Sequence, residues 1–557
     1  MIDDKVMYFR NQIIFIFFLS TVYCLLSTSA NAYWGHPDEE FLERGKFSYV
    51  ESALSAENDP ELLGLLKFYR GDYEGAWRVL SSSGIFKDPV SRLCPKGDDK
   101  CLMGISKRSS LKKYIRKRSF VKYLAHMKSI SWKFAKRFES EHFVFKLASR
   151  DMVLKDGAIK ALEACVAEVG EWIRYVPGEK ILVEVYRNKK DFAFATTLGD
   201  ELLEKSGVVG VAKFHRLMLM SPESLAFGYS WQDTFCHEYI HQALKAKAGM
   251  RLPLWFQEGV ARHGEAIWRR GMFKMSPGDE EELMLAAREN RLVTFNRMEP
   301  SMVYLKDTKE ISLAFTQVAL AIDRMLSLAG EFKREQSMRE LLIGIDNGMG
   351  FKSAFKDIYR KSWRKFEKKL FKEWKTSAKN VEELEYTGAF RSLVQFKESA
   401  HDEIIFLGPR AAHIIKLGDD MMTRGKYFSA LELYRTALSN GSSNPFILSR
   451  MVKAYRSAKK RNDARSIAEK LLKQNPNWPP SYETMGNIYH DMAKFKDAVR
   501  MYEKYFTFNP YHKDLYIKTA DMLVDLGRTK DAIAYLEKAL ILDPNNRKAR
   551  ELKKSLK

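Results

Sequence analysis

Four alanines near the C-terminus recur at one fixed interval, and this constrains the fold more than any other feature of the chain. The positions that stand 34 residues apart are Ala430, Ala464, Ala498 and Ala532. A repeat of this length forms one pair of antiparallel helices, which cannot bury both of its faces alone, so neighbouring pairs stack. The sequence therefore predicts an all-α solenoid of about four repeats over residues 411–557, ending in a basic extension.

Three segments carry a family resemblance in this region. KYFSALELYRTAL, KFKDAVRMYEKYF and TKDAIAYLEKAL resemble the second helix of the tetratricopeptide repeat (TPR). The second repeat departs from the pattern, with Val452 where a small residue is usual and Lys459 at the turn. The resemblance implies a superhelix whose concave face binds an extended peptide or a helix of a protein partner.

The N-terminus has the pattern of a secretory signal peptide. Lys5 and Arg10 precede an apolar run from Ile13 to Leu26, and the small residues before Ala32 predict cleavage after that position. The alternative is an uncleaved membrane anchor, but this run is shorter than the roughly 20 residues that span a bilayer. We expect residues 1–32 to direct export to a bacterial periplasm or the medium.

The cysteines bear on this expectation. Cys94 and Cys101 bracket the polar stretch CPKGDDKC, and an oxidising compartment would favour a disulfide between them over two free thiols. Cys165 and Cys236 lie in apolar patterns of helical period, which predicts buried hydrophobic side chains and not zinc ligands.

The chain between the signal peptide and the repeats divides into three regions. Residues 33–137 predict a small helical region, which includes the hairpin pattern PELLGLLKFYRGDYEGAWRVL. Residues 138–378 alternate β-rich runs such as KILVEVY with helical runs, which predicts an α+β domain with a small mixed sheet. Residues 379–410 are interpreted as a linker.

A candidate metal site lies in this α+β region. His237 and His241 stand four residues apart in HEYIH, so on a helix both imidazoles project from one face and reach one ion at about 2.0 Å each. Glu258 follows on a second predicted helix and offers a third ligand. Two His and one Glu leave one position open, as in hydrolytic zinc centres. Glu238 lies beside His237, where it would face water and not the metal.

The alternative interpretation is that HEYIH is a charged helix surface, since HExxH also arises by chance. The context LPLWFQEGVA argues against this alternative. A glutamate after an apolar pair and before a glycine, one helical hairpin away from HEYIH, is hard to explain as surface.

HEYIH followed by LPLWFQEGVARHGE resembles the gluzincin metallopeptidases, in particular the bacterial peptidase MA-like type. The resemblance covers about 240 residues and implies a zincin-like fold with a mixed sheet beside the HExxH helix. It implies that His237, His241 and Glu258 bind Zn²⁺ and that Glu238 is the general base in hydrolysis of peptide bonds. It also implies that VVGVAKFHRLMLMS is the edge strand along which a peptide substrate lies extended.

One departure from the family concerns catalysis. Related gluzincins often place an oxyanion-stabilising tyrosine where this chain has Phe315, so either Tyr304 or His263 substitutes or the enzyme is slow. The chain also lacks the Gly-x-Met-Glu-Asn block with which aminopeptidase relatives hold a substrate's amine. The sequence therefore favours an endopeptidase. The rival hypothesis is an envelope adaptor that works through its TPR repeats and retains an inactive peptidase fold.

The formal net charge of +22 is concentrated in two stretches. Residues 107–137 hold twelve Lys or Arg and no acid, and residues 351–375 hold ten against three acids. In the second stretch, apolar residues recur at helical spacing, which predicts a buried stripe with a basic outer face. Because export makes nucleic acid a poor partner, the alternatives are an anionic envelope surface, an acidic protein, or simply a solvated face.

Overall fold

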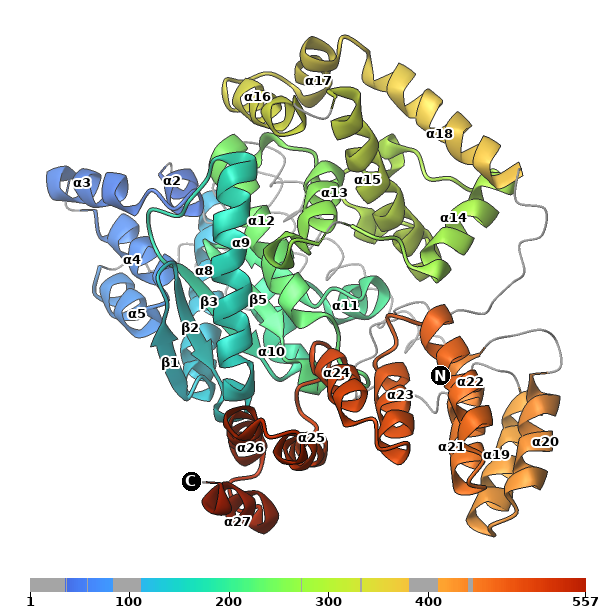
Figure 1. The fold of residues 1–557 in the computed structure, drawn as a ribbon. Helices are drawn as coiled ribbons and strands as arrows, with labels where there is room; N and C mark the ends of the chain where they lie inside the picture. Colours follow the sequence, from blue (N-terminus) through green and yellow to red (C-terminus); the bar gives the residue numbers. More distant parts are fainter. Residues whose placement is uncertain are drawn as a thin grey trace, which may run out of the picture.

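The computed structural model describes most of the chain (Figure 1). The described residues are 36–83, 112–379 and 409–556, apart from short gaps at 37, 58, 272, 331–332 and 439–443. The predicted signal peptide, Cys94, Cys101 and nearly all of the predicted linker lie outside the described residues.

The described part of the N-terminal region is helical, as its pattern predicts, although the predicted boundary between residues 137 and 138 falls inside the first strand of the sheet. Its helices are α2 (Glu39–Glu43), α3 (Phe47–Glu57), α4 (Pro60–Tyr69), α5 (Tyr73–Ser82) and α8 (Lys112–Ile130). The side chain of Asp59 caps the first turn of α4, and the turn at Gly71 leads into α5, so these two helices form the predicted hairpin.

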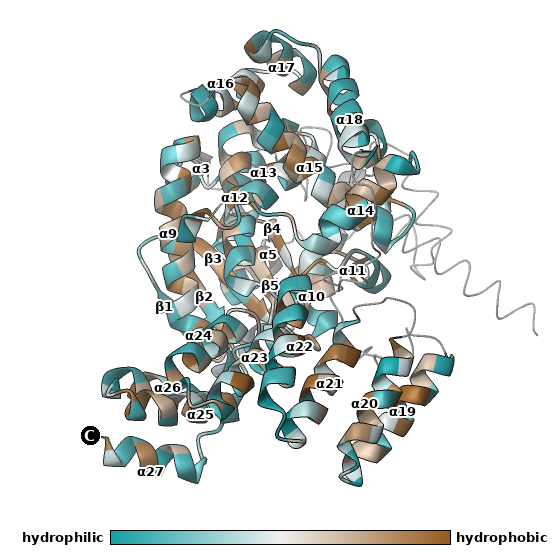
Figure 2. Ribbon diagram, turned by 45° about the vertical axis from the view of Figure 1, so that its right-hand side comes forward, coloured by the Kyte–Doolittle hydropathy of each residue, from teal (hydrophilic) through white to brown (hydrophobic). Residues whose placement is uncertain are grey.

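A five-stranded mixed sheet forms the centre of the molecule (Figure 1). Its strands are β1 (Lys136–Glu139), β2 (Phe143–Leu147), β3 (Ile181–Tyr186), β4 (Gly210–Lys213) and β5 (Arg216–Met220). Their order is β1-β2-β3-β5-β4; β2, β3 and β5 run parallel, and the two edge strands β1 and β4 run antiparallel to their neighbours. Figure 2 shows hydrophobic residues along the inner strands of this sheet.

Both faces of the sheet are covered. On one face, Phe143 of β2 contacts Tyr239 of α12 (Trp231–Ala248), which packs beside α9 (Lys155–Ile173). On the other face the N-terminal helices pack over a buried polar cluster. There Arg216 donates to the Phe68 carbonyl and to the Tyr73 hydroxyl, and Glu184 accepts from Tyr73. The buried charge of Arg216 is thus paired and hydrogen-bonded, as a buried charge must be.

Further helices extend the central unit. They are α10 (Lys189–Thr196), α11 (Asp200–Ser206), α13 (Leu254–Gly264), α14 (Pro277–Arg288), α15 (Thr308–Leu328), α16 (Arg334–Asp346), α17 (Phe351–Tyr359) and α18 (Trp363–Lys379). Among the described helices, α15 alone is long and apolar enough to span a membrane, but 61% of that window is buried inside the protein. It packs tightly on α13, with Gly259 close to Val318 and Ile322, which is the behaviour of a core helix.

The C-terminal region consists of four helix pairs and one more helix. The pairs are α19 (Pro409–Thr423) with α20 (Tyr427–Ala437), α21 (Pro445–Ser457) with α22 (Arg461–Gln474), α23 (Pro479–Asp491) with α24 (Phe495–Phe506), and α25 (Lys513–Asp525) with α26 (Thr529–Leu542); α27 (Arg547–Ser555) follows. The glycines fit the pattern: a Cβ at Gly418 or Gly486 would collide with the ring of Tyr434 or Tyr502 on the second helix of the pair.

The last helix pairs are docked on the central unit. One hydrophobic core runs from Leu42 through the sheet and α12 to Ala549, whereas the first two pairs have small cores of their own. At the contact, Arg150 donates to the carbonyl of Leu542, and the Tyr511 hydroxyl contacts both Asp151 and Ser221. The later repeats are therefore part of the same packed body as the sheet.

The structure joins two of the cysteines in a way that the sequence did not predict. Cys165 on α9 and Cys236 on α12 are both fully buried, as predicted, but they form a disulfide with a Cα–Cα distance of 5.7 Å. An apolar pattern on each helix predicts that its cysteine is buried. It does not reveal that the two helices cross where these cysteines, 71 residues apart in sequence, come into contact.

Candidate metal centre

Two helices bring the predicted ligands together. His237 and His241 stand one turn apart on α12 and project toward α13, which carries Glu258. Gly249, with a φ of +61°, ends α12, and the chain then turns through Pro253 into α13. Glycine adopts this left-handed conformation without steric penalty, and proline fits the start of a helix.

The ligand atoms have the spacing of a tetrahedral metal site. Nε2 of His237 lies 3.2 Å from Nε2 of His241, and each of these nitrogens lies 3.4 Å from Oε2 of Glu258. Bonds of about 2.05 Å to a tetrahedral Zn²⁺ would place its ligand atoms about 3.3 Å apart. The three side chains therefore fit one zinc ion without moving, and a fourth position remains for water or substrate.

Glu265 is a further residue of the candidate site that the sequence reasoning did not single out. Its Oε2 lies 3.3 Å from Nδ1 of His237, and its Oε1 accepts a hydrogen bond of 2.6 Å from Arg262. A carboxylate on the far nitrogen of a ligating histidine fixes the ring orientation and makes the ligand more basic. The available signal was the spacing: Glu265 follows Glu258 by seven residues, two helical turns on the same face.

The carboxylates set the protonation of this cluster. Burial alone would lower the pKa of His237, but hydrogen bonds to Glu258 and Glu265 raise it to about 10. Burial would raise the pKa of Glu258, but the charges of His241 and His237 and their hydrogen bonds lower it. In the metal-free protein His237 thus carries a proton at neutral pH, and a metal would displace that proton because ligands bind deprotonated.

Glu238 lies beside this cluster and not within it. Its carboxylate is 4% exposed and accepts a hydrogen bond from the Ala212 amide of the edge strand β4. A Cβ at Gly210 would lie 2.5 Å from Glu238 Oε1, so this close approach of strand and carboxylate requires glycine. Burial raises the pKa of Glu238, which suits a group that must accept and release a proton.

The predicted edge strand is corrected by the structure. VVGVAKFHRLMLMS is not one strand, because Phe214 and His215 both adopt positive φ and turn the chain back on itself. Of the two strands that this segment forms, β4 lies at an edge of the sheet, whereas β5 lies between β3 and β4. The segment has no Gly, Pro, Asn or Asp at this turn, so its sequence did not reveal it.

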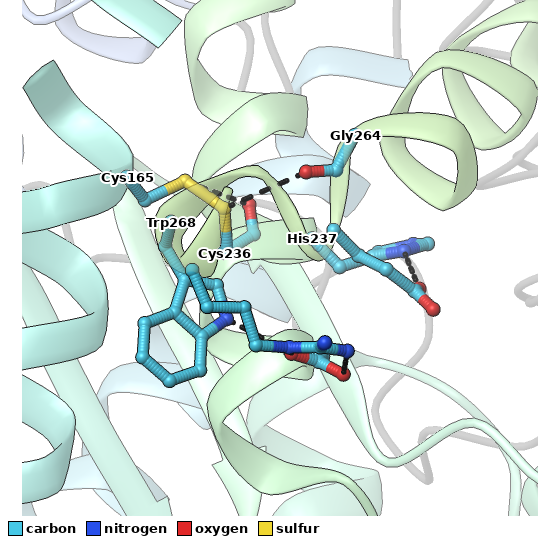
Figure 3. The surroundings of a disulfide bond; sticks show 8 residues. Cys165, Cys236, His237, Gly264 and Trp268 are labelled. Carbon is cyan, nitrogen blue, oxygen red and sulfur yellow. Dashed lines mark hydrogen bonds and ion pairs between the residues drawn. A yellow bond between two sulfur atoms is a disulfide. The ribbon is translucent and has the colours of Figure 1, made fainter. Parts of the chain in front are cut away.

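The start of α12 is fixed from two sides (Figure 3). The Cys165–Cys236 disulfide joins α12 to α9 directly before His237. Asp233 accepts hydrogen bonds from Trp268 and from Arg269 of the 3-10 turn Ile267–Arg269. These contacts hold the helix that carries both histidines in a fixed orientation.

Phe315 and the two candidate oxyanion donors, His263 and Tyr304, lie on different elements of the fold. Phe315 is half-buried on α15, one helical turn before Val318. Val318 lies close to Gly259 of α13, the residue that follows Glu258. His263 packs 6.2 Å from Trp172, and its electrostatic neighbours are Asp323 and Arg334, so its ring faces a different region.

Tyr304 ends the 3-10 turn Met302–Tyr304, which packs against α11 and α15.

A second group of metal-binding residue types lies on the surface. Glu141, His142 and Glu163 also gather ligand atoms within 4.8 Å of one another. However, Nδ1 of His142 is already hydrogen-bonded to Glu163 at 2.6 Å, and the side chain of Glu141 is 80% exposed. Among the described residues, the group on α12 and α13 is the better metal site because its three side chains are at most 20% exposed and their ligand atoms are evenly spaced.

Comparisons with known proteins concern the C-terminal helices. The tetratricopeptide repeat family matches residues 479–512 and 514–546. The predicted TPR repeats are thereby confirmed for α23–α26 and their loops. No curated protein matches the chain.

Several solved structures are similar to part of the chain. A crystal structure of MamA protein is 20% identical, covers 26% of this chain and 80% of its own, and has a TM-score of 0.25. MamA from Desulfovibrio magneticus RS-1 is 19% identical, with 27% and 85% covered and a TM-score of 0.25. YrrB, described as a TPR protein with an unusual peptide-binding site, is 17% identical, with 26% and 74% covered and a TM-score of 0.24.

Proposed function

We propose that this protein is a zinc-dependent hydrolase of peptide bonds whose TPR repeats bind a protein substrate or partner. The spacing of His237, His241 and Glu258 carries the proposal, because three ligand atoms 3.2–3.4 Å apart match one tetrahedral zinc ion. The helix-sheet arrangement, with α12 packed beside a mixed sheet that ends in β4, is consistent with a zincin-like fold.

Each residue of the site has a distinct role in this proposal. When bound, Zn²⁺ would polarise a carbonyl and lower the pKa of water. Glu238 would take a proton from water and pass it to the leaving amine. Glu265, held by Arg262, would orient the ring of His237.

The substrate would lie along the sheet edge. β4 pairs on one side only, with β5, so an extended peptide can add to it through main-chain hydrogen bonds. At Ala212, both outward main-chain groups are already engaged, the amide by Glu238 and the carbonyl by Lys245. A peptide would therefore have to compete with these two side chains, and the absence of an amine-binding motif favours an endopeptidase.

The TPR repeats indicate protein binding in either of two functions. A stacked array of this kind presents an extended concave surface to a peptide or helix. The alternative function is an adaptor in which the repeats do the work and the metal site is weak or inactive. Two observations favour the adaptor: the family match lies wholly within the repeats, and Phe315 stands where an oxyanion-stabilising tyrosine is expected.

The proposal includes export from the cytoplasm. The signal-peptide pattern over residues 1–32 supports it, and so does the buried disulfide between Cys165 and Cys236, since disulfides persist mainly in oxidising compartments.

Wild type, three variants and one assay separate the two functions. Glu238→Gln should keep the metal and the fold while cleavage of unfolded protein substrates falls roughly 10²-fold to 10⁴-fold. Phe315→Tyr should speed cleavage by up to about 10²-fold if its hydroxyl reaches the developing charge. The control, Glu201→Gln on α11, removes an exposed carboxylate and should leave the rate unchanged.

Each outcome supports either the enzyme or the adaptor. Wild-type cleavage that Glu238→Gln abolishes supports the enzyme. Activity that appears only in Phe315→Tyr, or in neither protein while zinc is fully bound, supports the adaptor.

A further inference from the structure

Helix α18 has two sharply different faces. Its inner face buries Trp363, Phe366, Leu370 and Trp374 against the core. Trp363 stacks on Trp255 of α13, at a ring distance of 4.9 Å, so the orientation of α18 is fixed by the same packing that supports the metal-binding helices.

The outer face of α18 is a continuous row of cations. At about 100° per residue, seven exposed Lys and Arg side chains fall within an arc of about 140° opposite the buried face. They are Arg364, Lys365, Lys368, Lys369, Lys372, Lys375 and Lys379. The two acids of the helix lie outside this arc: Glu367 accepts from the amide of Phe295, and Glu373 pairs with Arg324 and, at 3.9 Å, with Lys369 at the edge of the arc. The outer arc of α18 therefore holds no acid.

Helix α17 and the turn after it extend this surface. Lys352, Lys356, Arg360 and Lys361 are exposed there, against the single exposed acid Asp357. We call the exposed cations of α17, the turn and α18 the basic face. By contrast, two described cations of the other basic stretch are paired with acids: Lys133 with Asp191, and Lys128 with Glu74, where Lys128 also lies over the ring of Trp77.

The side chains of the basic face favour an anionic surface as the partner. The large hydrophobic side chains exposed in the described part of the chain lie outside α17 and α18, so the face offers no group for insertion into a lipid core or for stacking on bases. A straight row of flexible, long cations suits a flat surface of many dispersed negative charges. Figure 2 shows α18 as mainly hydrophilic at the periphery of the molecule.

The basic face lies far from the last TPR repeats. In both views, α17 and α18 lie at the opposite end of the molecule from α25–α27 (Figures 1 and 2). A surface bound there would leave the last TPR repeats directed away from it and accessible to a protein.

We propose that the basic face docks the protein on an anionic lipid bilayer by electrostatic attraction, without insertion. Docking of this kind is reversible and weakens as salt screens the charges. The proposal is independent of whether the metal centre is catalytic.

Vesicle sedimentation of the full mature chain tests the proposal. Wild type should bind phosphatidylglycerol-containing phosphatidylcholine vesicles at low salt, release at high salt, and not bind vesicles of phosphatidylcholine alone. The triple variant Lys365→Gln, Lys368→Gln, Lys372→Gln should lose about fivefold in partitioning per cation, hence about 10²-fold in total. These three side chains are exposed, so an unchanged melting temperature should accompany the loss.

A matched control carries the same change of charge elsewhere. Lys453→Gln, Lys460→Gln, Lys470→Gln removes three exposed cations from α21, α22 and the turn between them, and should alter partitioning by less than about threefold because those charges lie beyond the screening length. Equal losses in the two triple variants would overturn the proposal. Absence of wild-type binding to the anionic vesicles would also overturn it, as would binding to soluble polyphosphate but not to vesicles.

Discussion

Gly228 lies at the contact between the central unit and the TPR repeats, and its replacement by alanine should weaken that contact. Gly228 has a φ of +74°, and an added Cβ would lie 2.3 Å from the carbonyl oxygen of Phe508. Two hydrogen bonds cross the contact here: the amide of Tyr229 donates to Phe508 at 3.1 Å, and the Trp231 indole donates to Phe506 at 3.2 Å.

The expected loss follows from these contacts. Left-handed backbone costs a residue with a Cβ about 1–2 kcal/mol. A carbon and a carbonyl oxygen normally approach to about 3.3 Å, so the two segments must separate by about 1 Å. That separation would break both hydrogen bonds, each worth about 1 kcal/mol. We therefore expect Gly228→Ala to lower the free energy of unfolding by about 3–4 kcal/mol.

Gly527→Ala is the matched control. Gly527 has a φ of +72° and lies in the TPR repeats, but an added Cβ there meets nothing within 4 Å. It should lose only the backbone contribution of about 1–2 kcal/mol. Urea unfolding of the two variants measures the difference, which we expect to be about 2 kcal/mol. If both variants lose the same stability, the repeats are not docked as the structure has them.

Two further predictions concern the surroundings of His237. The raised pKa of His237 stabilises the metal-free protein; this contribution is complete below the unfolded pKa of about 6.5 and is lost as pH rises through about 10. Melting temperatures measured across this pH range should show the loss, and Glu265→Gln should make it smaller. An equal dependence of the melting temperature on pH in the two proteins would contradict the assignment. Replacing Cys165 and Cys236 by alanine should lower the free energy of unfolding by up to about 4 kcal/mol, because the bond closes a loop of 71 residues. Alkylation of the denatured, unreduced protein at these cysteines would show that the bond does not form.

The sequence was most informative where a short pattern determines local geometry. A period of 34 residues with alanines at one helix crossing predicts stacked helix pairs, because a larger side chain would not fit there. The spacing of His237 and His241 places both rings on one helix face. The context of Glu258 correctly predicted that its carboxylate reaches them.

Contacts between distant segments were not predictable in the same way. The Cys165–Cys236 bond, the hydrogen bond that Glu265 accepts from His237 and the docking of Phe508 on Gly228 each depend on how separate helices pack. No local period encodes such packing. The turn at Phe214 and His215 was missed for another reason, since positive φ at residues other than glycine leaves little trace in a sequence.

Metal analysis of the purified mature protein tests the central claim most directly. Wild type should hold one zinc per chain, because three ligand atoms already stand at tetrahedral spacing. Glu258→Ala should lose most of the zinc, since two histidines leave the ion under-coordinated, while Glu141→Ala in the surface group should retain it. Less than about a tenth of an equivalent in wild type after zinc loading would contradict the zinc centre, as would equal zinc in wild type and Glu258→Ala.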